Sequence, residues 1–130
     1  MRTYDKVALH YMSLFELVTN TIPVDCIVND QIIYFVVYKN ELKKVLANKG
    51  EKIKILNKHI GKNIIVFPYC ETKEEFIREV ISEKVKIKNV GNTLKLFISK
   101  QDTKRVKKDL EAIKSFLERI YNVENVVFRW

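Results

Sequence analysis

Lysine and arginine concentrate in two short stretches of the chain, and this clustering is the clearest sign of chemistry in the sequence. The first stretch, Lys43 to Lys62, holds seven lysines and one acid, Glu51. The second, Lys100 to Lys108, holds five basic residues and one acid, Asp102. With a net charge of +8 over 130 residues, such clusters favour a polyanionic partner, although lysine-rich composition also accompanies thermostability.

The two basic stretches occupy the same place in a pattern that occurs twice. From Cys26 to Phe67, and again from Val85 to Phe128, a strand, a turn, a second strand, a basic helical stretch and a third strand follow one another. Internal repeats of this kind reveal the architecture of a chain. We therefore predict two domains, 1–68 and 69–130, each with the order helix–strand–strand–helix–helix–strand. Modules of about 60 residues bury modest cores, so each would be marginal alone.

The first half is predicted to begin with an amphipathic helix from about Tyr4 to Asn20. Its apolar stripe consists of Val7, Tyr11, Leu14, Phe15 and Val18. Two strands should follow, Val24 to Val28 and Ile32 to Tyr38, with Asn29-Asp30 as the turn. Because the second strand is apolar on both faces, it should be central, or covered by helices on one side and by another domain on the other.

A helix–break–helix segment and a third strand are predicted to complete the first half. The short helix spans Glu41 to Leu46, and a polar break follows over residues 47–50. The second helix spans Glu51 to Ile60 and stops at Gly61, a residue suited to a left-handed helix end. The third strand begins at Asn63, and Pro68 is expected to end it.

The second half is predicted to repeat these elements. Thr72 and Glu75 have the spacing of a capping box at a helix start. Strands are expected over Val85 to Lys88 and Thr93 to Ile98, with Gly91-Asn92 in the hairpin turn. Asp102 is expected to cap the next helix, before a last strand from Val126 to Phe128, and the short first helix and the break are less distinct than in the first half. The apolar stripe of that helix consists of Val106, Leu110, Ile113, Leu117 and Ile120.

The remaining residues that could do chemistry favour packing. Phe15, Phe35, Phe76, Phe116 and Phe128 alternate with aliphatic residues and are expected in the core. Cys26 and Cys70 lack the spacing and the histidine partners of a metal site. Two reduced thiols, buried or half-buried, are expected, with a disulfide between them as the alternative. The two histidines are isolated and should be surface or hydrogen-bonded residues.

No catalytic motif is visible, so we expect no enzymatic activity and no cofactor or metal. No apolar run approaches the ~20 residues that span a bilayer. Residues 1–6 are polar and charged and do not resemble a signal peptide. A cytoplasmic protein is therefore expected, and we also expect it to be a monomer.

Several short motifs, in this order and spacing, resemble those of a known family. They are Leu14-Phe15-Glu16, Asp25-Cys26-Ile27-Val28, Ile33-x-Phe35-Val36-Val37, the break around Gly50, Glu74-Glu75-Phe76-Ile77 and Asn122-Val123-Glu124-Asn125-Val126-Val127. The family is that of the archaeal NusA-like transcription factors, small proteins with two tandem type II KH domains. The resemblance implies an α+β fold with three-stranded mixed sheets packed on helices. It also implies non-catalytic binding of single-stranded, nascent RNA in transcription elongation or termination, alongside RNA polymerase.

KH domains clamp about four nucleotides against a GxxG loop. Glycine lets the phosphate backbone approach the main chain, and the following helix N-terminus adds N–H donors. In the first half, Ala47-Asn48-Lys49-Gly50 matches this loop, with alanine in place of the first glycine. In the second half the matching positions fall at about Lys104 to Lys107, without any glycine, so that domain is expected to be degenerate.

The resemblance and the charges together give the candidate RNA-binding residues. In the first half they are Lys43, Lys44, Ala47, Asn48, Lys49, Gly50, Lys52, Ile53, Lys54 and Val66. In the second half they are Lys104, Arg105, Lys107 and Lys108. The plainer alternatives are solvated basic faces and, for Ile53 and Val66, burial in the core. An alternative for the whole chain is a protein-interaction module that docks on the transcription or translation machinery, its RNA groove largely lost.

Overall fold

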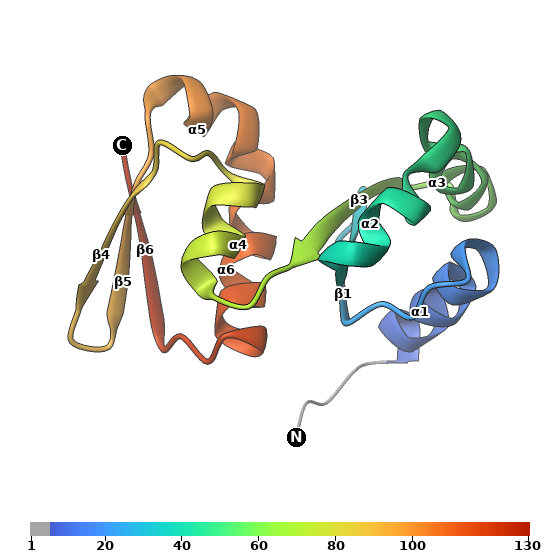
Figure 1. Ribbon diagram of the computed structural model, residues 1–130, viewed down its shortest axis with the longest axis horizontal. Helices are drawn as coiled ribbons and strands as arrows, with labels where there is room; N and C mark the ends of the chain where they lie inside the picture. Colours follow the sequence, from blue (N-terminus) through green and yellow to red (C-terminus); the bar gives the residue numbers. More distant parts are fainter. Residues whose placement is uncertain (1–5) are drawn as a thin grey trace. The chain divides into compact units, whose positions relative to one another are not determined.

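The computed structural model describes residues 6–130, and its contacts divide the chain into two compact units between Tyr69 and Cys70. Among the described residues, each unit contains one three-stranded sheet and three α-helices (Figure 1). In both sheets the first two strands are antiparallel and the third runs parallel to the second. The predicted α+β class, with three-stranded mixed sheets packed on helices, is confirmed.

The elements follow one another in the same order in both units. The first unit contains α1 (Lys6–Thr19), β1 (Asp25–Val28), β2 (Ile32–Tyr38), α2 (Lys39–Val45), α3 (Ala47–Ile60) and β3 (Asn63–Tyr69). The second contains α4 (Lys73–Val80), β4 (Lys86–Val90), β5 (Thr93–Phe97), α5 (Lys100–Val106), the 3-10 turn η1 (Lys107–Asp109), α6 (Leu110–Ile120) and β6 (Asn125–Arg129). The predicted order helix–strand–strand–helix–helix–strand is therefore present in each unit.

In the first unit, the central strand β2 packs against the helices. Phe35 of this strand and Phe15 of α1 are fully buried, and their ring centroids lie 4.3 Å apart. The predicted stripe of α1 is rotated slightly from the observed one, because Val7 is 53% exposed whereas Ala8 is buried. The predicted first residues of this helix, Tyr4 and Asp5, lie outside the described part of the chain.

Strand β3 does not end at Pro68, contrary to the prediction. It continues to Tyr69, with Val37 opposite Pro68 and Tyr38 opposite Tyr69. Proline is tolerated because β3 is an edge strand that pairs only with β2, so its missing N–H interrupts no second ladder.

The turn between β1 and β2 lies one residue later than predicted. Val28 pairs with Ile33, and the Asn29 N–H donates to the Ile32 carbonyl at 3.0 Å. Asp30 and Gln31 are therefore the turn residues. The Asn29 side chain accepts hydrogen bonds from the backbone of Gln31 and Ile32, an Asx turn that fixes this position.

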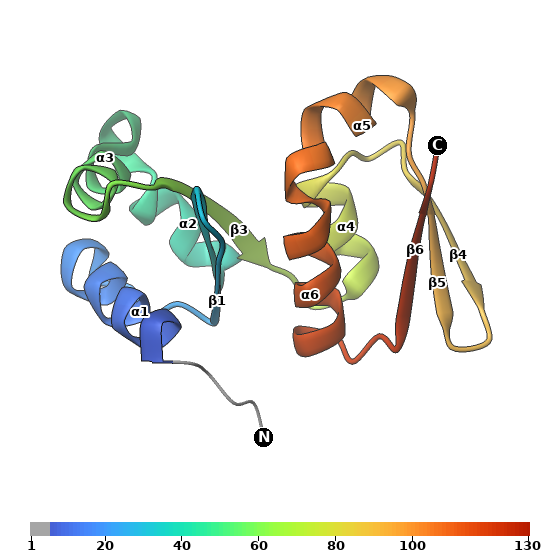
Figure 2. The ribbon, with the colours of Figure 1, turned by 180° about the vertical axis from the view of Figure 1, so that it is seen from behind.

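In the second unit, α4 and α6 lie on one face of the β4–β5–β6 sheet, as Figures 1 and 2 show from opposite sides. Leu94, Leu96 and Ile98 are buried, as are Phe76 of α4 and Phe116 of α6. The hairpin turn at Gly91-Asn92 is confirmed, since Val90 pairs with Thr93. The prediction that Phe128 is a core residue was too strong, because this side chain is only half-buried.

The two predicted caps of the second half have different outcomes. Thr72 caps α4, where its hydroxyl accepts from the Glu75 N–H at 3.2 Å. Asp102 is not the cap of α5; Ser99 holds that position, and its hydroxyl accepts from the Asp102 N–H at 3.1 Å. Asp102 instead lies in the first turn of the helix, where a carboxylate is favoured by the dipole.

Both cysteines are buried, and neither forms a disulfide bond. Within residues 6–130 no group of three or more acidic, histidine or cysteine side chains could hold a metal ion. Over the same residues, every helix is too short or too polar to cross a membrane.

Candidate nucleic-acid interface

The break between α2 and α3 in the first unit has an uncommon backbone. Asn48, Lys49 and Gly50 follow one another with φ values of 56°, 59° and 74°, all left-handed. Asparagine and glycine tolerate this region, but for a lysine it costs about 1–2 kcal/mol. Backbone strain of this kind clusters at binding sites. Regular helical geometry resumes at Glu51, so the break lies directly before the N-terminus of a ten-residue helical segment.

Gly50 is required by its conformation and leaves open space above it. A Cβ atom built on Gly50 meets no atom within 4 Å. An approaching ligand would therefore meet backbone there, without a side chain between them. The Gly50 N–H itself donates to the Leu46 carbonyl at 3.1 Å. This hydrogen bond stabilises the break and occupies the Gly50 N–H, so a ligand could be contacted only by the N–H groups of neighbouring residues.

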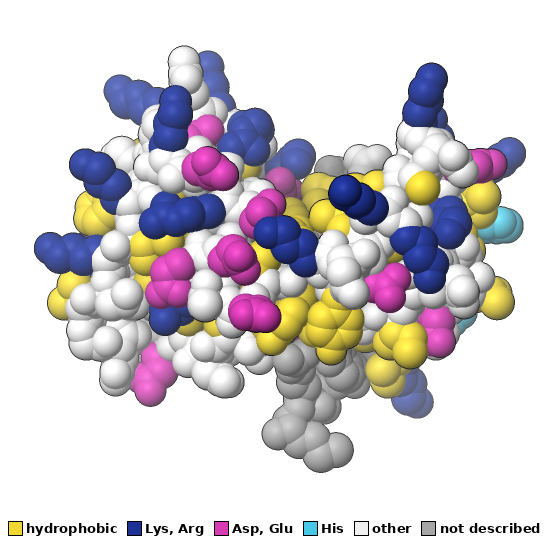
Figure 3. All heavy atoms as spheres, in the orientation of Figure 1, with side chains coloured by type: hydrophobic (Ala, Val, Ile, Leu, Met, Phe, Trp, Pro, Cys, Tyr) yellow, Lys and Arg dark blue, Asp and Glu magenta, His cyan; other side chains and the backbone are white. Residues whose placement is uncertain are grey.

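Most lysines around this break are free to act as cations toward solvent. Lys43, Lys49 and Lys54 are exposed and Lys52 is half-buried. None of these four forms an ion pair with an acid in residues 6–130. Figure 3 shows dark-blue side chains around α2 and at the tip where α2 leads into α3. The break is thus a positively charged projection of the first unit.

Lys44 differs from its neighbours because it has partners within the unit. Its ammonium donates to the Asn20 carbonyl at 3.0 Å, just beyond the end of α1, and lies 3.6 Å from the Glu41 carboxylate. A cation is favoured at a helix C-terminus. Lys44 therefore links α2 to α1, and this structural contact competes with any role in binding.

The apolar candidates are shared between the core and the surface. Ile53 of α3 and Val66 of β3 are half-buried and pack against the core cluster of the first unit. Ala47 is exposed in the break. Leu46, directly before the break, and Ile55, within α3, are exposed apolar residues that the sequence analysis did not single out. The signal that could have identified them as exposed is their position outside the predicted buried stripe that contains Ile53.

The second break lies three residues later than predicted. Lys104, Arg105 and Val106 belong to the last turn of α5, and the break consists of Lys107, Lys108 and Asp109. The two helices expected in the second half are therefore α5 and α6, with the break between them. In the described chain no residue of this segment has a positive φ, so the turn needs no glycine.

Two of the four candidate cations of the second break are engaged within the unit. Arg105 donates to the Ile81 carbonyl at the end of α4 and pairs with Asp102 at 3.2 Å. Lys108 pairs with the buried carboxylate of Asp109 at 3.1 Å. Lys104 and Lys107 are exposed. The second break therefore offers fewer free charges than the first and no left-handed loop.

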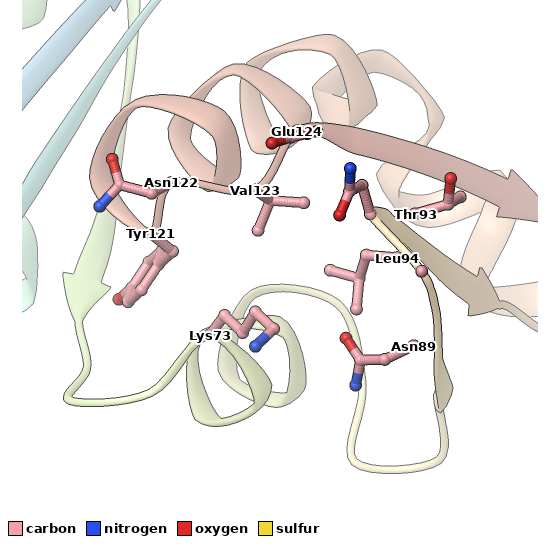
Figure 4. A pocket seen from close by; sticks show the side chains of 10 residues that line it. Lys73, Asn89, Thr93, Leu94, Tyr121, Asn122, Val123 and Glu124 are labelled. Atoms are coloured by element: carbon pink, nitrogen blue, oxygen red, sulfur yellow. The ribbon is translucent and has the colours of Figure 1, made fainter.

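A small hollow at the other end of α6 is a separate candidate site. Figure 4 shows Lys73 and Asn89 facing Asn122 and Glu124 across it, with the β4–β5 turn at one side. Its lining combines three asparagines with apolar side chains, one ammonium and one carboxylate. The Tyr121 hydroxyl beside it donates to the carbonyl of Cys70 and accepts from the N–H of the same residue. This mixture of charges does not select a polyanion, so the breaks remain the stronger candidates.

The arrangement defines a class of protein: two small α+β units, each with a mixed sheet and a helix–break–helix segment, consistent with a KH-like fold. A solved structure titled "Crystal structure of APE1850" has the same fold, with a TM-score of 0.77 over 97% of this chain and 100% of that one. The two sequences are 23% identical. This likeness establishes the fold.

Sequence comparison leads to archaeal proteins. The chain is 26% identical over 91 residues to a protein of Methanocaldococcus jannaschii named "Probable transcription termination protein NusA", and 30% identical over 91 residues to one of the same name in Methanococcus vannielii. These matches cover 67% of this chain but 50% and 53% of the relatives. The chain thus spans about half the length of the curated relatives it matches. No family model matches it.

Proposed function

We propose that this protein binds single-stranded RNA at the first helix break and acts as a non-catalytic factor in transcription elongation or termination. The observation that carries the proposal is the left-handed segment Asn48–Gly50, open above Gly50 and surrounded by unpaired lysines. Backbone accessible at a glycine, cations nearby and a helix N-terminus are what a phosphate chain requires. The names of the relatives add support for a role in transcription.

In the same proposal, residues 1–68 and 69–130 are tandem type II KH domains, the second degenerate. Nascent RNA and RNA polymerase are the partners, and the protein acts in the cytoplasm as a monomer. Lys43, Lys49, Lys52 and Lys54 neutralise phosphates, and Ile53 and Val66 border the surface that receives the bases.

A matched pair of substitutions at Gly50 tests the clamp. Gly50→Asp places a negative charge where the phosphate chain should pass, whereas Gly50→Asn has a similar size without the charge. Both residues tolerate left-handed backbone better than others. Gly50→Asp should weaken binding of a short single-stranded RNA about tenfold or more at low salt. Gly50→Asn should stay within about threefold of wild type.

The readout is fluorescence anisotropy of a labelled 12-mer at two salt concentrations, with circular dichroism to verify folding. Equal affinity of Gly50→Asp and Gly50→Asn would refute the clamp. An absence of saturable binding by the wild type at low salt would refute RNA binding altogether.

Docking on a protein of the transcription machinery is the second candidate function, favoured by the second unit. There Arg105 and Lys108 are held by Asp102 and Asp109, and the turn lacks left-handed residues. A pull-down with purified RNA polymerase, using wild type and a Lys104→Glu/Lys107→Glu variant, measures it.

A further inference from the structure

The sheet of the second unit has a face that none of the unit's own helices covers. Helices α4 and α6 lie on one side of β4, β5 and β6, and the other side is bare in both views (Figures 1 and 2). Along β5, Leu94 and Leu96 are buried against the helices. Lys95 and Phe97 alternate with them and therefore point to the bare side. This outer face can be followed residue by residue from the strand register.

All four basic residues of the three strands lie on this outer face. Lys86 pairs with Phe97, Lys88 pairs with Lys95, and Phe97 pairs with Arg129, and directly paired residues share a face. The strands contain no aspartate or glutamate. Acids of this unit gather elsewhere, over α4, where Figure 3 shows magenta side chains. The outer face is thus cationic without internal compensation.

The pairing of these cations is unfavourable for the isolated sheet. Lys88 lies directly opposite Lys95 on neighbouring strands. Like charges in this position destabilise a sheet. A bound polyanion would remove that repulsion, because each phosphate would neutralise one ammonium group.

Aromatic surface accompanies the charges. Phe97 is 41% exposed in the middle strand, with Lys86 on one side and Arg129 on the other. Trp130, the next residue after Arg129, is 66% exposed. A hollow at this end of the sheet is lined by Lys84, Lys86, Phe97, Ile98, Ser99, Arg129 and Trp130. Flat apolar rings between cations are suited to bases joined by phosphates.

We propose that this outer face is a second binding surface for single-stranded RNA, independent of the helix breaks. Bases stack on Phe97 and Trp130, and Lys86, Lys88, Lys95 and Arg129 receive the phosphates. Rings that alternate with cations match the spacing of bases and phosphates along a strand, and this alternation favours single-stranded RNA over an acidic protein. The proposal shares its ligand class with the function proposed above, but not its site.

Trp130 provides a local signal, since it is the only tryptophan of the chain. A uridine 15-mer should quench its fluorescence saturably, in wild type and equally in Gly50→Asp. Polyglutamate of similar charge should leave the emission unchanged. Loss of quenching in folded Gly50→Asp would show that the face is no independent site, and equal quenching by polyglutamate would show a general anion or acidic-protein surface. Either result overturns the proposal.

Substitutions at Phe97 separate stacking from apolar bulk. Phe97→Tyr should retain the affinity measured by Trp130 quenching, whereas Phe97→Leu should lose about five- to 150-fold. Lys88→Gln/Lys95→Gln should lower the slope of log affinity against log salt by about 1.4, with Lys58→Gln/Lys114→Gln as the control. Wild-type affinity in folded Phe97→Leu, or self-association that disappears with it, would refute RNA stacking on this face.

Discussion

The two helix breaks begin in the same way and then diverge within three residues. Val45 and Val106 are the last residues of α2 and α5, and both are buried. Lys44 and Arg105, one residue earlier, each donate to a carbonyl at the end of the preceding helix. Each also pairs with an acid three residues before it. Beyond the valines, the backbone of the first unit becomes left-handed, whereas the backbone of the second unit forms a right-handed 3-10 turn.

This difference separates scaffold from site. In both units, the contact of a basic side chain with a carbonyl of the preceding helix, together with the buried valine, holds the helices in place. These contacts are therefore structural and need no ligand. Of the two breaks in the described chain, only that of the first unit has a left-handed segment, which leaves the backbone open at Gly50. In the second unit the buried carboxylate of Asp109 binds Lys108 at that place. Basic residues near a break are therefore no measure of its binding capacity.

The shared scaffold is tested by truncating the two valines. Val45→Ala and Val106→Ala should each lower the free energy of unfolding by about 2–3 kcal/mol, because both side chains are fully or nearly fully buried. Urea denaturation measures the effect, with the exposed Val90→Ala as a control that should change it by about 0.5 kcal/mol or less. A loss confined to one of the two variants would break the equivalence.

The difference in binding is tested by removing charge from each break. Lys43→Gln/Lys49→Gln/Lys54→Gln should lower the slope of log RNA affinity against log salt by about 2, since single-stranded contacts contribute about 0.7 each. Lys104→Gln/Lys107→Gln should change this slope by about 0.7 or less. Anisotropy titrations over a salt series give both values. A larger effect of the second variant would reverse the comparison.

The difference in backbone hand predicts opposite signs for one substitution. Lys49→Gly should raise the free energy of unfolding by about 0.5–1 kcal/mol, because glycine relieves left-handed strain at φ 59°. Lys107→Gly should lower it by about 0.5–1 kcal/mol, because Lys107 has helical φ and ψ. Urea midpoints of the two variants are compared with wild type. Changes of the same sign would contradict the assigned conformations.

The smallest expected effect on stability concerns the ion pair between Arg105 and Asp102 in the second unit. A hydrogen bond from Arg105 lowers the pKa of Asp102 below its ordinary value of 3.8. The stability that this depressed pKa represents is complete above pH 3.8 and is lost as the pH falls through the folded-state pKa. Asp102→Asn should therefore make the thermal midpoint of unfolding less dependent on pH in acid. At neutral pH the midpoint should be nearly unchanged. An unaltered acid profile would show that the pair is not coupled to folding.

Local patterns in the sequence predicted most elements, and long-range pairing corrected several of their limits. The apolar strand Ile32–Tyr38, the turn at Gly91-Asn92 and the Thr72 cap were correct because each is determined by neighbouring residues. Pro68 was misjudged because its place at a sheet edge depends on a partner strand. The break between the last two helices was placed three residues too early because the apolar stripe from Val106 onward continues across the turn.

The candidate residues were identified by charge and resemblance, and their partners were beyond the reach of sequence. Nothing in the spacing of Lys44 or Arg105 shows that each of them donates a hydrogen bond to a carbonyl at the end of the preceding helix. The basic outer face of β4–β5–β6 was equally invisible, since it arises from strand register across three separated segments.

The sequence by itself determined the repeated order of elements, the apolar stripes and the abundance of cations, because periodicity and composition are properties of neighbouring residues. The tertiary structure decided which cations are tethered and which are free, and which backbone at a break turns left-handed. It also decided which face of a sheet is left bare. These properties depend on residues that folding brings together from distant parts of the chain, and so they appear only when the chain is folded.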